Sequence, residues 1–210
     1  MKMVVLFGPQ GSGNHLFSKI FSLHSDVHGW KAALEPDGYF IPHSSEPFNY
    51  YWNNITKITK DIMGGKQYAI TSISVPYIEQ GLPKIPPIIE FIDKLTSVGI
   101  EPIPVAVGRD NNILTYQQTR VRGGPTWGSM IQLLDRMSET PFYVSQELLY
   151  LYRKKYVKSI SSYLNFPLDW ENSKIDDILK EDANKKYTHN ANPTWLDQIV
   201  KIISTPTNRG

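Results

Sequence analysis

A glycine-rich segment near the N-terminus contains residue types that bind anions through the backbone. Gly8 to His15 reads GPQGSGNH and directly follows the apolar run Met3 to Phe7. The apolar residues after it recur with the 3.6-residue period of a helix. N–H groups of such a loop and of the first helical turn hold a phosphate or sulfate without a lysine. We therefore predict an anion-binding loop formed by Gly8, Pro9, Gln10, Gly11, Ser12, Gly13, Asn14 and His15; a tight turn that merely joins strand to helix is the alternative.

This loop matches only the first part of the nucleoside-triphosphate motif G-x-x-x-x-G-K-[ST]. Asn14 stands where the motif has the lysine that reaches the β and γ phosphates. His15 stands where it has the hydroxyl that binds magnesium. These replacements disfavour a magnesium-dependent kinase, and we expect an anion held without a metal ion.

Arg109 is the strongest charged candidate outside the loop. It follows the apolar, strand-like run Ile100 to Val107. Ligands of open α/β sheets bind beyond the carboxyl ends of the strands, so this position predicts a contact with a bound anion. An ordinary ion pair with Asp110, or a helix cap, is the alternative.

Strand-like and helix-like segments alternate along most of the chain. Besides residues 3–7 and 100–107, strands are expected at 67–75 and 142–145, and helices at 86–98, 111–121, 129–138, 147–164 and 174–182. This alternation predicts an α/β fold with three layers, in which helices cover both faces of an open, mostly parallel sheet. We expect one domain over residues 1–204 and a flexible tail over 205–210.

Two regions do not follow this alternation. Residues 30–54 are rich in proline, glycine, asparagine and aromatic side chains, and residues 123–128 form a turn cluster. Long irregular loops in a compact domain are often functional. The aromatic residues of the first region form either a wall for a bound sugar or aromatic alcohol, or a lid packed on its own domain: Tyr39, Phe40, Phe48, Tyr50, Tyr51 and Trp52.

Composition excludes several classes of protein. The 210 residues carry 22 Lys and Arg against 20 Asp and Glu, and this net charge of +2 is too small for a general nucleic-acid surface. The chain has no cysteine, which removes disulfides and thiolate chemistry. No apolar run is long enough for a signal peptide or a membrane span. A cytoplasmic protein that binds neither nucleic acid nor membrane is the expectation.

Several segments in order resemble the sulfotransferase family. The S-G-N-H-L-F segment at 12–17 and the L-H-S-D-V-H-G segment at 23–29 resemble its opening loop and following helix. The V-A-V-G-R-D segment at 105–110, F-Y-V-S-Q-E-L-L at 142–149 and I-S-S-Y-L-N-F-P-L-D at 160–169 resemble its later motifs. The resemblance implies a P-loop-like nucleotide-binding fold and the donor 3′-phosphoadenosine 5′-phosphosulfate, with no metal. It also implies a hydroxyl or amine of a small molecule or carbohydrate as acceptor.

The resemblance also assigns roles to individual residues. The glycine loop holds the 5′-phosphosulfate end of the donor, and Arg109 contacts its 3′-phosphate. Gln117 stands where the family has a serine that binds the same phosphate. Lys185 and Lys186 lie where a final basic loop covers it, so Lys186 is assigned to the nucleotide; a solvated run of charges is the alternative.

Departures from the family pattern concern catalysis. The basic residue before S-G falls on Gly11, and the K-T-H segment falls on residues 71–74, which read TSIS. Glu35 is the predicted general base, with a solvated loop carboxylate as the alternative; His28 and His43 are weaker candidates. His15 is predicted to donate to the anion, or else to pack against the sheet. Three functions stay open: a sulfotransferase, a similar nucleotide-binding protein without catalysis, and a degenerate P-loop kinase.

Overall fold

Five parallel strands form the central sheet of the protein. The computed structural model describes residues 1–35, 45–79, 82–122 and 126–180. The strands are β1 (Lys2–Gly8), β2 (Val27–His28), β3 (Tyr68–Ser74), β6 (Glu101–Gly108) and β7 (Phe142–Ser145), and they pair in the order β2-β3-β1-β6-β7. Two short strands, β4 (Tyr77–Glu79) and β5 (Leu82–Lys84), pair antiparallel outside this sheet.

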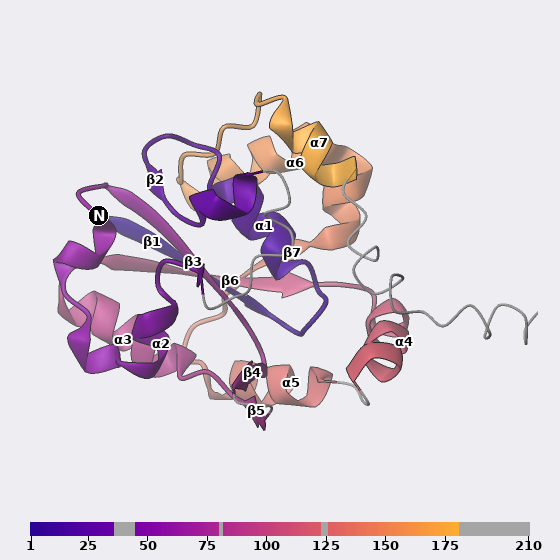
Figure 1. Cartoon of the computed structure of the whole chain (residues 1–210), viewed down its shortest axis with the longest axis horizontal. Coiled ribbons are helices and arrows are strands. Elements are labelled where there is room, and N and C mark those ends of the chain that lie inside the picture. Colours follow the sequence, from indigo (N-terminus) through magenta and orange to yellow (C-terminus); the bar gives the residue numbers. More distant parts are fainter. Residues whose placement is uncertain (36–44, 80–81, 123–125, 181–210) are drawn as a thin grey trace, which may run out of the picture.

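Helices cover both faces of the sheet, as Figure 1 shows. The helices α1 (Asn14–Phe21), α6 (Gln146–Leu164) and α7 (Lys174–Lys180) lie on one face. The opposite face carries α2 (Asn49–Asn53), α3 (Ile88–Ser97) and α5 (Trp127–Arg136). The fold is therefore a three-layer α/β arrangement, and the prediction of an open parallel sheet with helices on both faces is confirmed.

Side chains of the central strand β1 point alternately to the two faces of the sheet, so the apolar core has two parts. On β1, Val4 and Leu6 face the side of α1, whereas Met3, Val5 and Phe7 face the side of α3. All five side chains have no exposed surface. A continuous apolar run is what a strand buried on both faces requires, which explains why this strand is readable in the sequence.

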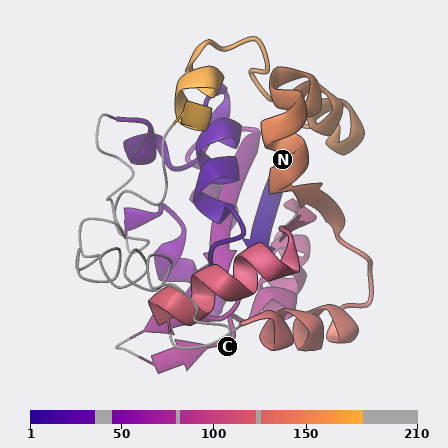
Figure 2. The ribbon, with the colours of Figure 1, turned by 90° about the vertical axis from the view of Figure 1, so that its right-hand side faces the viewer.

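The strand order places a topological switch at the end of β1. The chain passes from β1 to β2 and β3 on one side, then crosses to β6 and β7 on the other. Ligands of open α/β sheets bind at such a point, beyond the carboxyl ends of the strands. The helix α4 (Asn111–Arg122) lies at this edge, and Figure 2 shows it crossing in front of the sheet.

Part of the irregular region 30–54 is structured and packed. It contains a 3-10 helix (η1, Lys31–Leu34) and α2, and it is followed by further 3-10 turns at Ile55–Lys57 and Lys60–Met63. Phe48 and Trp52 are buried, and Trp52 stacks on Phe91 of α3 with ring centroids 4.0 Å apart. These two aromatic side chains belong to the domain core rather than to an acceptor wall, whereas Tyr50 is exposed. Tyr39 and Phe40 lie outside the described residues.

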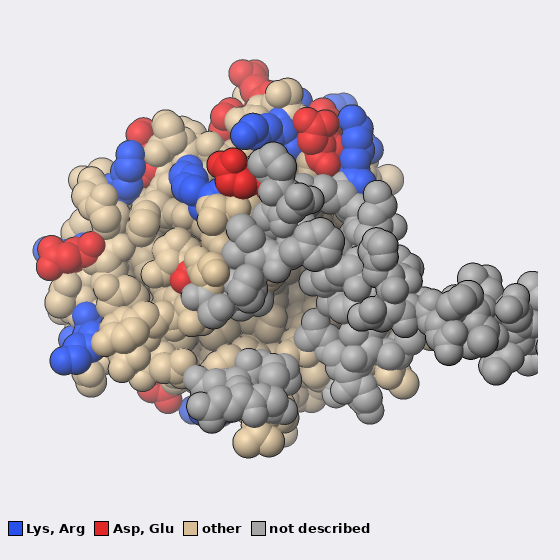
Figure 3. All heavy atoms as spheres, viewed as in Figure 1, with Lys and Arg blue, Asp and Glu red and all other residues tan. Residues whose placement is uncertain are grey.

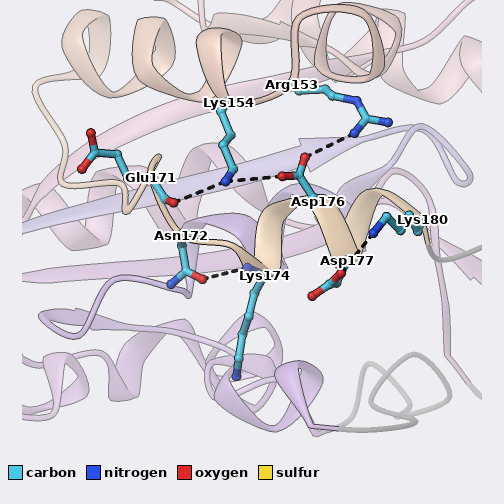
Figure 4. A network of polar contacts seen from close by, with 8 residues as sticks. All are labelled: Arg153, Lys154, Glu171, Asn172, Lys174, Asp176, Asp177 and Lys180. Carbon is cyan, nitrogen blue, oxygen red and sulfur yellow. Dashed lines mark hydrogen bonds and ion pairs between the residues drawn. The ribbon is translucent and has the colours of Figure 1, made fainter.

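Helix α6 is kinked at Arg153, where φ is 47° and ψ is −127°. An ion-pair network surrounds the kink: Arg153 Nη1 lies 3.2 Å and Lys154 Nζ 3.3 Å from the two carboxylate oxygens of Asp176 in α7. Figure 4 shows Asp176 between the two basic side chains. On the face shown in Figure 3, charged side chains of both signs gather over α6 and α7. The network therefore fastens α7 to α6 without creating a patch of one charge there.

None of the helices in the described part of the chain has the length and apolar content needed to cross a membrane.

Candidate functional site

The glycine loop leaves the end of β1 as a tight turn and enters α1. The N–H of Ser12 donates to the carbonyl of Pro9 over 3.1 Å, and the N–H of Phe17 donates to Gly13 in the first helical bond. Gly11 and Gly13 have φ of 88° and 107°. These left-handed conformations suit glycine and strain other residues, so the loop path depends on these two positions.

Polar side chains of the loop point into the protein and stabilise the turn. Ser12 and Asn14 are 0% and 4% exposed. The Ser12 hydroxyl donates to Asn14 Oδ1 over 3.3 Å, and Asn14 Nδ2 donates to the carbonyl of Gly8 over 3.0 Å. Asn14 Nδ2 also lies 3.4 Å from the Ile73 carbonyl and from Ser74 Oγ, at the end of β3. The amide that replaces the motif lysine therefore joins the ends of two strands, and the donors that the loop offers to an anion are backbone N–H groups.

The first turn of α1 supplies further backbone donors. Its N-cap is Gly13, which has no side chain to satisfy the first N–H groups, and no acidic residue stands in this turn. The first N–H groups of a helix have no intrahelical acceptor, and together with the positive end of the helix dipole they favour an anion here. The His15 ring packs edge-on against the buried Trp30, with centroids 4.7 Å apart. Trp30 lies between β2 and η1 rather than in a strand, so this contact is not packing against the sheet, and the role of His15 toward an anion stays a prediction.

Arg109 reaches the glycine loop from the end of β6. Its Nη1 donates to the carbonyl of Gly11 over 2.7 Å and to Gln117 Oε1 over 2.5 Å. The structure thus brings together three sequence-predicted elements, namely the loop, Arg109 and Gln117. Partial burial lowers the pKa of the Arg109 guanidinium, an effect that the nearby Glu147 opposes.

Glu147 supplies a negative charge beside Arg109. Its Oε1 accepts the backbone N–H of Asp110 over 2.9 Å, and its Oε2 accepts the Ser145 hydroxyl over 2.9 Å. Partial burial opposes ionisation, but the hydrogen bonds from Asp110 and Ser145 and the charge of Arg109 together hold the pKa of Glu147 below its ordinary value. The cationic field at the loop is therefore partly compensated.

Sequence reasoning missed two glutamines that contact the loop. Gln118, 1% exposed, donates from Nε2 to the carbonyl of Gln10 over 2.5 Å. Gln146, at the start of α6, packs against Gly13, where a Cβ atom would lie 3.3 Å from its side-chain amide carbon. Gln118 follows the buried Leu114 by four residues and so lies on the same helix face, which is the one signal in the sequence.

Glu35 lies at the end of η1 and is exposed. The next nine residues lie outside the described part of the chain, so the assignment of Glu35 as general base stays a prediction. Lys185, Lys186 and His43, and the tail at 205–210, also lie outside it. His28 is described: burial, Lys31 and Lys66 lower its pKa, and its ring packs edge-on against Phe48 with centroids 5.1 Å apart.

Another glutamate, Glu46, is buried beside β3. It is 4% exposed, and its two oxygens accept the backbone N–H groups of Phe48 (2.9 Å) and Ser72 (3.4 Å). Because β2 pairs with β3 only at Tyr68 and Ala69, Glu46 serves as an acceptor for the strand beyond β2. Burial raises the pKa of this carboxyl to about 8, although hydrogen bonds from Thr71, Phe48 and Ser72 act in the opposite direction.

Across the described ranges, no group of three or more histidine and carboxylate side chains is arranged to hold a metal ion. The sequence matches no protein-family model, and no curated protein sequence shows significant similarity to it.

Proposed function

We propose that this protein is a sulfotransferase that uses 3′-phosphoadenosine 5′-phosphosulfate. The observation that carries the proposal is the contact between Arg109 and the glycine loop, with Arg109 Nη1 2.7 Å from the Gly11 carbonyl. This contact joins the ends of β1 and β6. These two strands are neighbours in the sheet, and the strand order changes direction between them. This contact supports the proposal that the two predicted anion-binding elements act in one site.

The residues at this site suit a nucleotide that carries two separate anionic groups. Backbone N–H groups from the loop and from the first turn of α1 would receive the phosphosulfate end. Arg109, with Gln117 beside it, would receive the 3′-phosphate through the nitrogens that the loop contact leaves available. Lys186 remains the proposed second cation for that phosphate.

The bound donor would supply an activated sulfuryl group, and the protein would supply orientation and proton transfer. The acceptor hydroxyl or amine must lose its proton as the sulfur–oxygen or sulfur–nitrogen bond forms. Glu35 is the proposed base for this proton. Loop N–H groups, with His15 as a further donor, would stabilise the charge that develops on the leaving phosphate.

Calorimetry with adenosine 3′,5′-bisphosphate, in buffer with magnesium and in buffer with EDTA, tests the binding part of this proposal. We expect the same affinity in both buffers, because the donors at the site are N–H groups and a guanidinium. Binding that disappears with EDTA would instead support a kinase-like site. Transfer of labelled sulfate from the donor to phenolic and carbohydrate acceptors then tests catalysis.

A nucleotide-binding protein without catalysis is the second candidate, and one observation favours it. Between Gly8 and Asn14 the loop carries no basic side chain, and the Asn14 amide is bonded to strand ends. The loop between Gly8 and Asn14 therefore has no basic side chain that could neutralise the sulfuryl group during its transfer. Tight binding of adenosine 3′,5′-bisphosphate without sulfate transfer to any acceptor, and without donor hydrolysis, would select this candidate.

A further inference from the structure

One buried side chain joins the glycine loop to the connection between α4 and α5. Gln118 reaches the loop from α4, and its Nε2 donates to the carbonyl of Gln10 over 2.5 Å. Its Oε1 accepts the backbone N–H of Thr126 over 2.6 Å. Thr126 is the N-cap of α5. A single amide group, 1% exposed, therefore connects two segments that are far apart in the sequence.

This contact sets the direction of a donor in the loop. In a planar trans peptide, the carbonyl of one residue and the N–H of the next point to opposite sides of the chain. The Gln10 carbonyl points toward Gln118, so the N–H of Gly11 points away from α4. The Gly11 carbonyl is held by Arg109 in the same way, and the N–H of Ser12 is turned to Pro9. Two successive peptide planes are thus fixed, one by Gln118 of α4 and one by Arg109 at the end of β6.

We propose that Gln118 is a positioning residue of the anion site. Its amide bonds to the backbone at Gln10 and at Thr126, and through the first of these contacts it directs the Gly11 N–H to the side of the loop opposite α4. Because the same amide holds Thr126, the loop and the start of α5 are coupled. The identity of the anion rests on the proposed function, whereas the fixed direction of the peptide planes does not.

Two substitutions at Gln118 separate its two contacts. Gln118→Met keeps a similar length and removes both hydrogen bonds. Gln118→Glu keeps an acceptor for Thr126, and at a pH where the new carboxyl is ionised it places a carboxylate oxygen against the Gln10 carbonyl; measured there, it disrupts the loop contact alone. Thr119→Ala is the matched control, since Thr119 is an exposed neighbour on the same helix. Circular dichroism and thermal melting establish that each variant folds.

Hydrogen exchange of the free protein is the readout that does not depend on the ligand. In Gln118→Met we expect faster exchange at the Ser12 amide and at Thr126, and in Gln118→Glu faster exchange at Ser12 only. Affinity for adenosine 3′,5′-bisphosphate should fall about tenfold in both, which corresponds to about 1.4 kcal/mol. Thr119→Ala should change neither quantity.

Wild-type exchange at Ser12 in Gln118→Met would overturn the proposal. Faster exchange at Ser12 with unchanged affinity would overturn it as well, since the loop contact would then have no bearing on the anion. If the wild-type protein does not bind adenosine 3′,5′-bisphosphate, the proposed function fails. The same exchange measurement, combined with calorimetry of inorganic sulfate and pyrophosphate, then decides whether Gln118 positions an anion loop.

Discussion

Replacing Glu46 by Gln should change how the stability of the protein depends on pH. Burial raises the pKa of Glu46 from 4.5 to about 8 in the folded protein. Between these values the unfolded chain releases the proton while the folded protein keeps it, so the unfolded state binds fewer protons. The free energy of unfolding therefore decreases as pH rises from 4.5 to 8. Each pH unit corresponds to about 1.4 kcal/mol, which gives about 5 kcal/mol over the interval.

The substitution removes this titration but also changes a hydrogen bond. Both oxygens of Glu46 accept backbone N–H groups, from Phe48 and from Ser72. A glutamine has one oxygen, and its amide nitrogen would face one of these N–H donors, at a cost of about 1–3 kcal/mol. We expect Glu46→Gln to be less stable than the wild type near pH 5 and as stable or more stable near pH 8.

Urea unfolding of both proteins at half-unit steps from pH 5 to 8 measures the effect. The quantity to compare is the difference in unfolding free energy between variant and wild type, because other groups titrate equally in both and cancel. His28 is one such group, since its lowered pKa favours the folded state as pH rises toward 6.5. Glu139→Gln, at an exposed carboxylate, serves as the control. A difference that stays constant from pH 5 to 8 would refute the reasoning for Glu46.

Three further substitutions test the site. Arg109→Ala removes a charge-assisted contact, and we expect affinity for adenosine 3′,5′-bisphosphate to fall about ten- to a hundredfold in calorimetry. The loss of affinity should be smaller for an analogue that lacks the 3′-phosphate. An equal loss for both ligands would mean that Arg109 acts through the Gly11 carbonyl alone. Glu35→Gln should keep this affinity and lower sulfate transfer by about 10²–10⁴-fold, whereas unchanged transfer in a labelled-sulfate assay would remove Glu35 from catalysis. Gly13→Ala places a Cβ at φ 107° and 3.3 Å from Gln146, and should lower the free energy of unfolding in urea by about 1–2 kcal/mol or more; a wild-type value would show that the loop relaxes freely.

The main elements were predictable because their signals are local. The strand at β1 is a continuous apolar run, and the predicted strand at 142–145 coincides with β7. Strand β2 has two residues and exists only through its pairing with β3, so no periodicity marks it. Helix α2 lies in a region rich in turn-forming residues, and it is held by packing of Phe48 and Trp52 in the core. Tertiary contact, rather than propensity, determines these short elements.

The sequence likewise predicts only part of the candidate site. Glycine spacing and the position of Arg109 after a strand are visible in the sequence, and the structure brings both together. Burial of Glu46, Gln118 and Gln146 is not visible, because it depends on which segments cover each side chain in the folded protein. Polar residues are mostly exposed, so the sequence gives no reason to place Glu46 and Gln146 inside, and for Gln118 its only signal is the helix face shared with Leu114.

The charges around the loop indicate how it would select a ligand. Arg109 stands beside Glu147, and each shifts the pKa of the other toward the charged form. Because Glu147 compensates its charge, Arg109 attracts anions only weakly from a distance. Recognition of an anion would then depend on the direction of the hydrogen-bond donors that contact it. The loop meets this condition through two peptide planes fixed by Arg109 and Gln118. The proposed site would therefore discriminate by the geometry of a bound oxyanion more than by its total charge, and its specificity would depend on the rigidity of the loop.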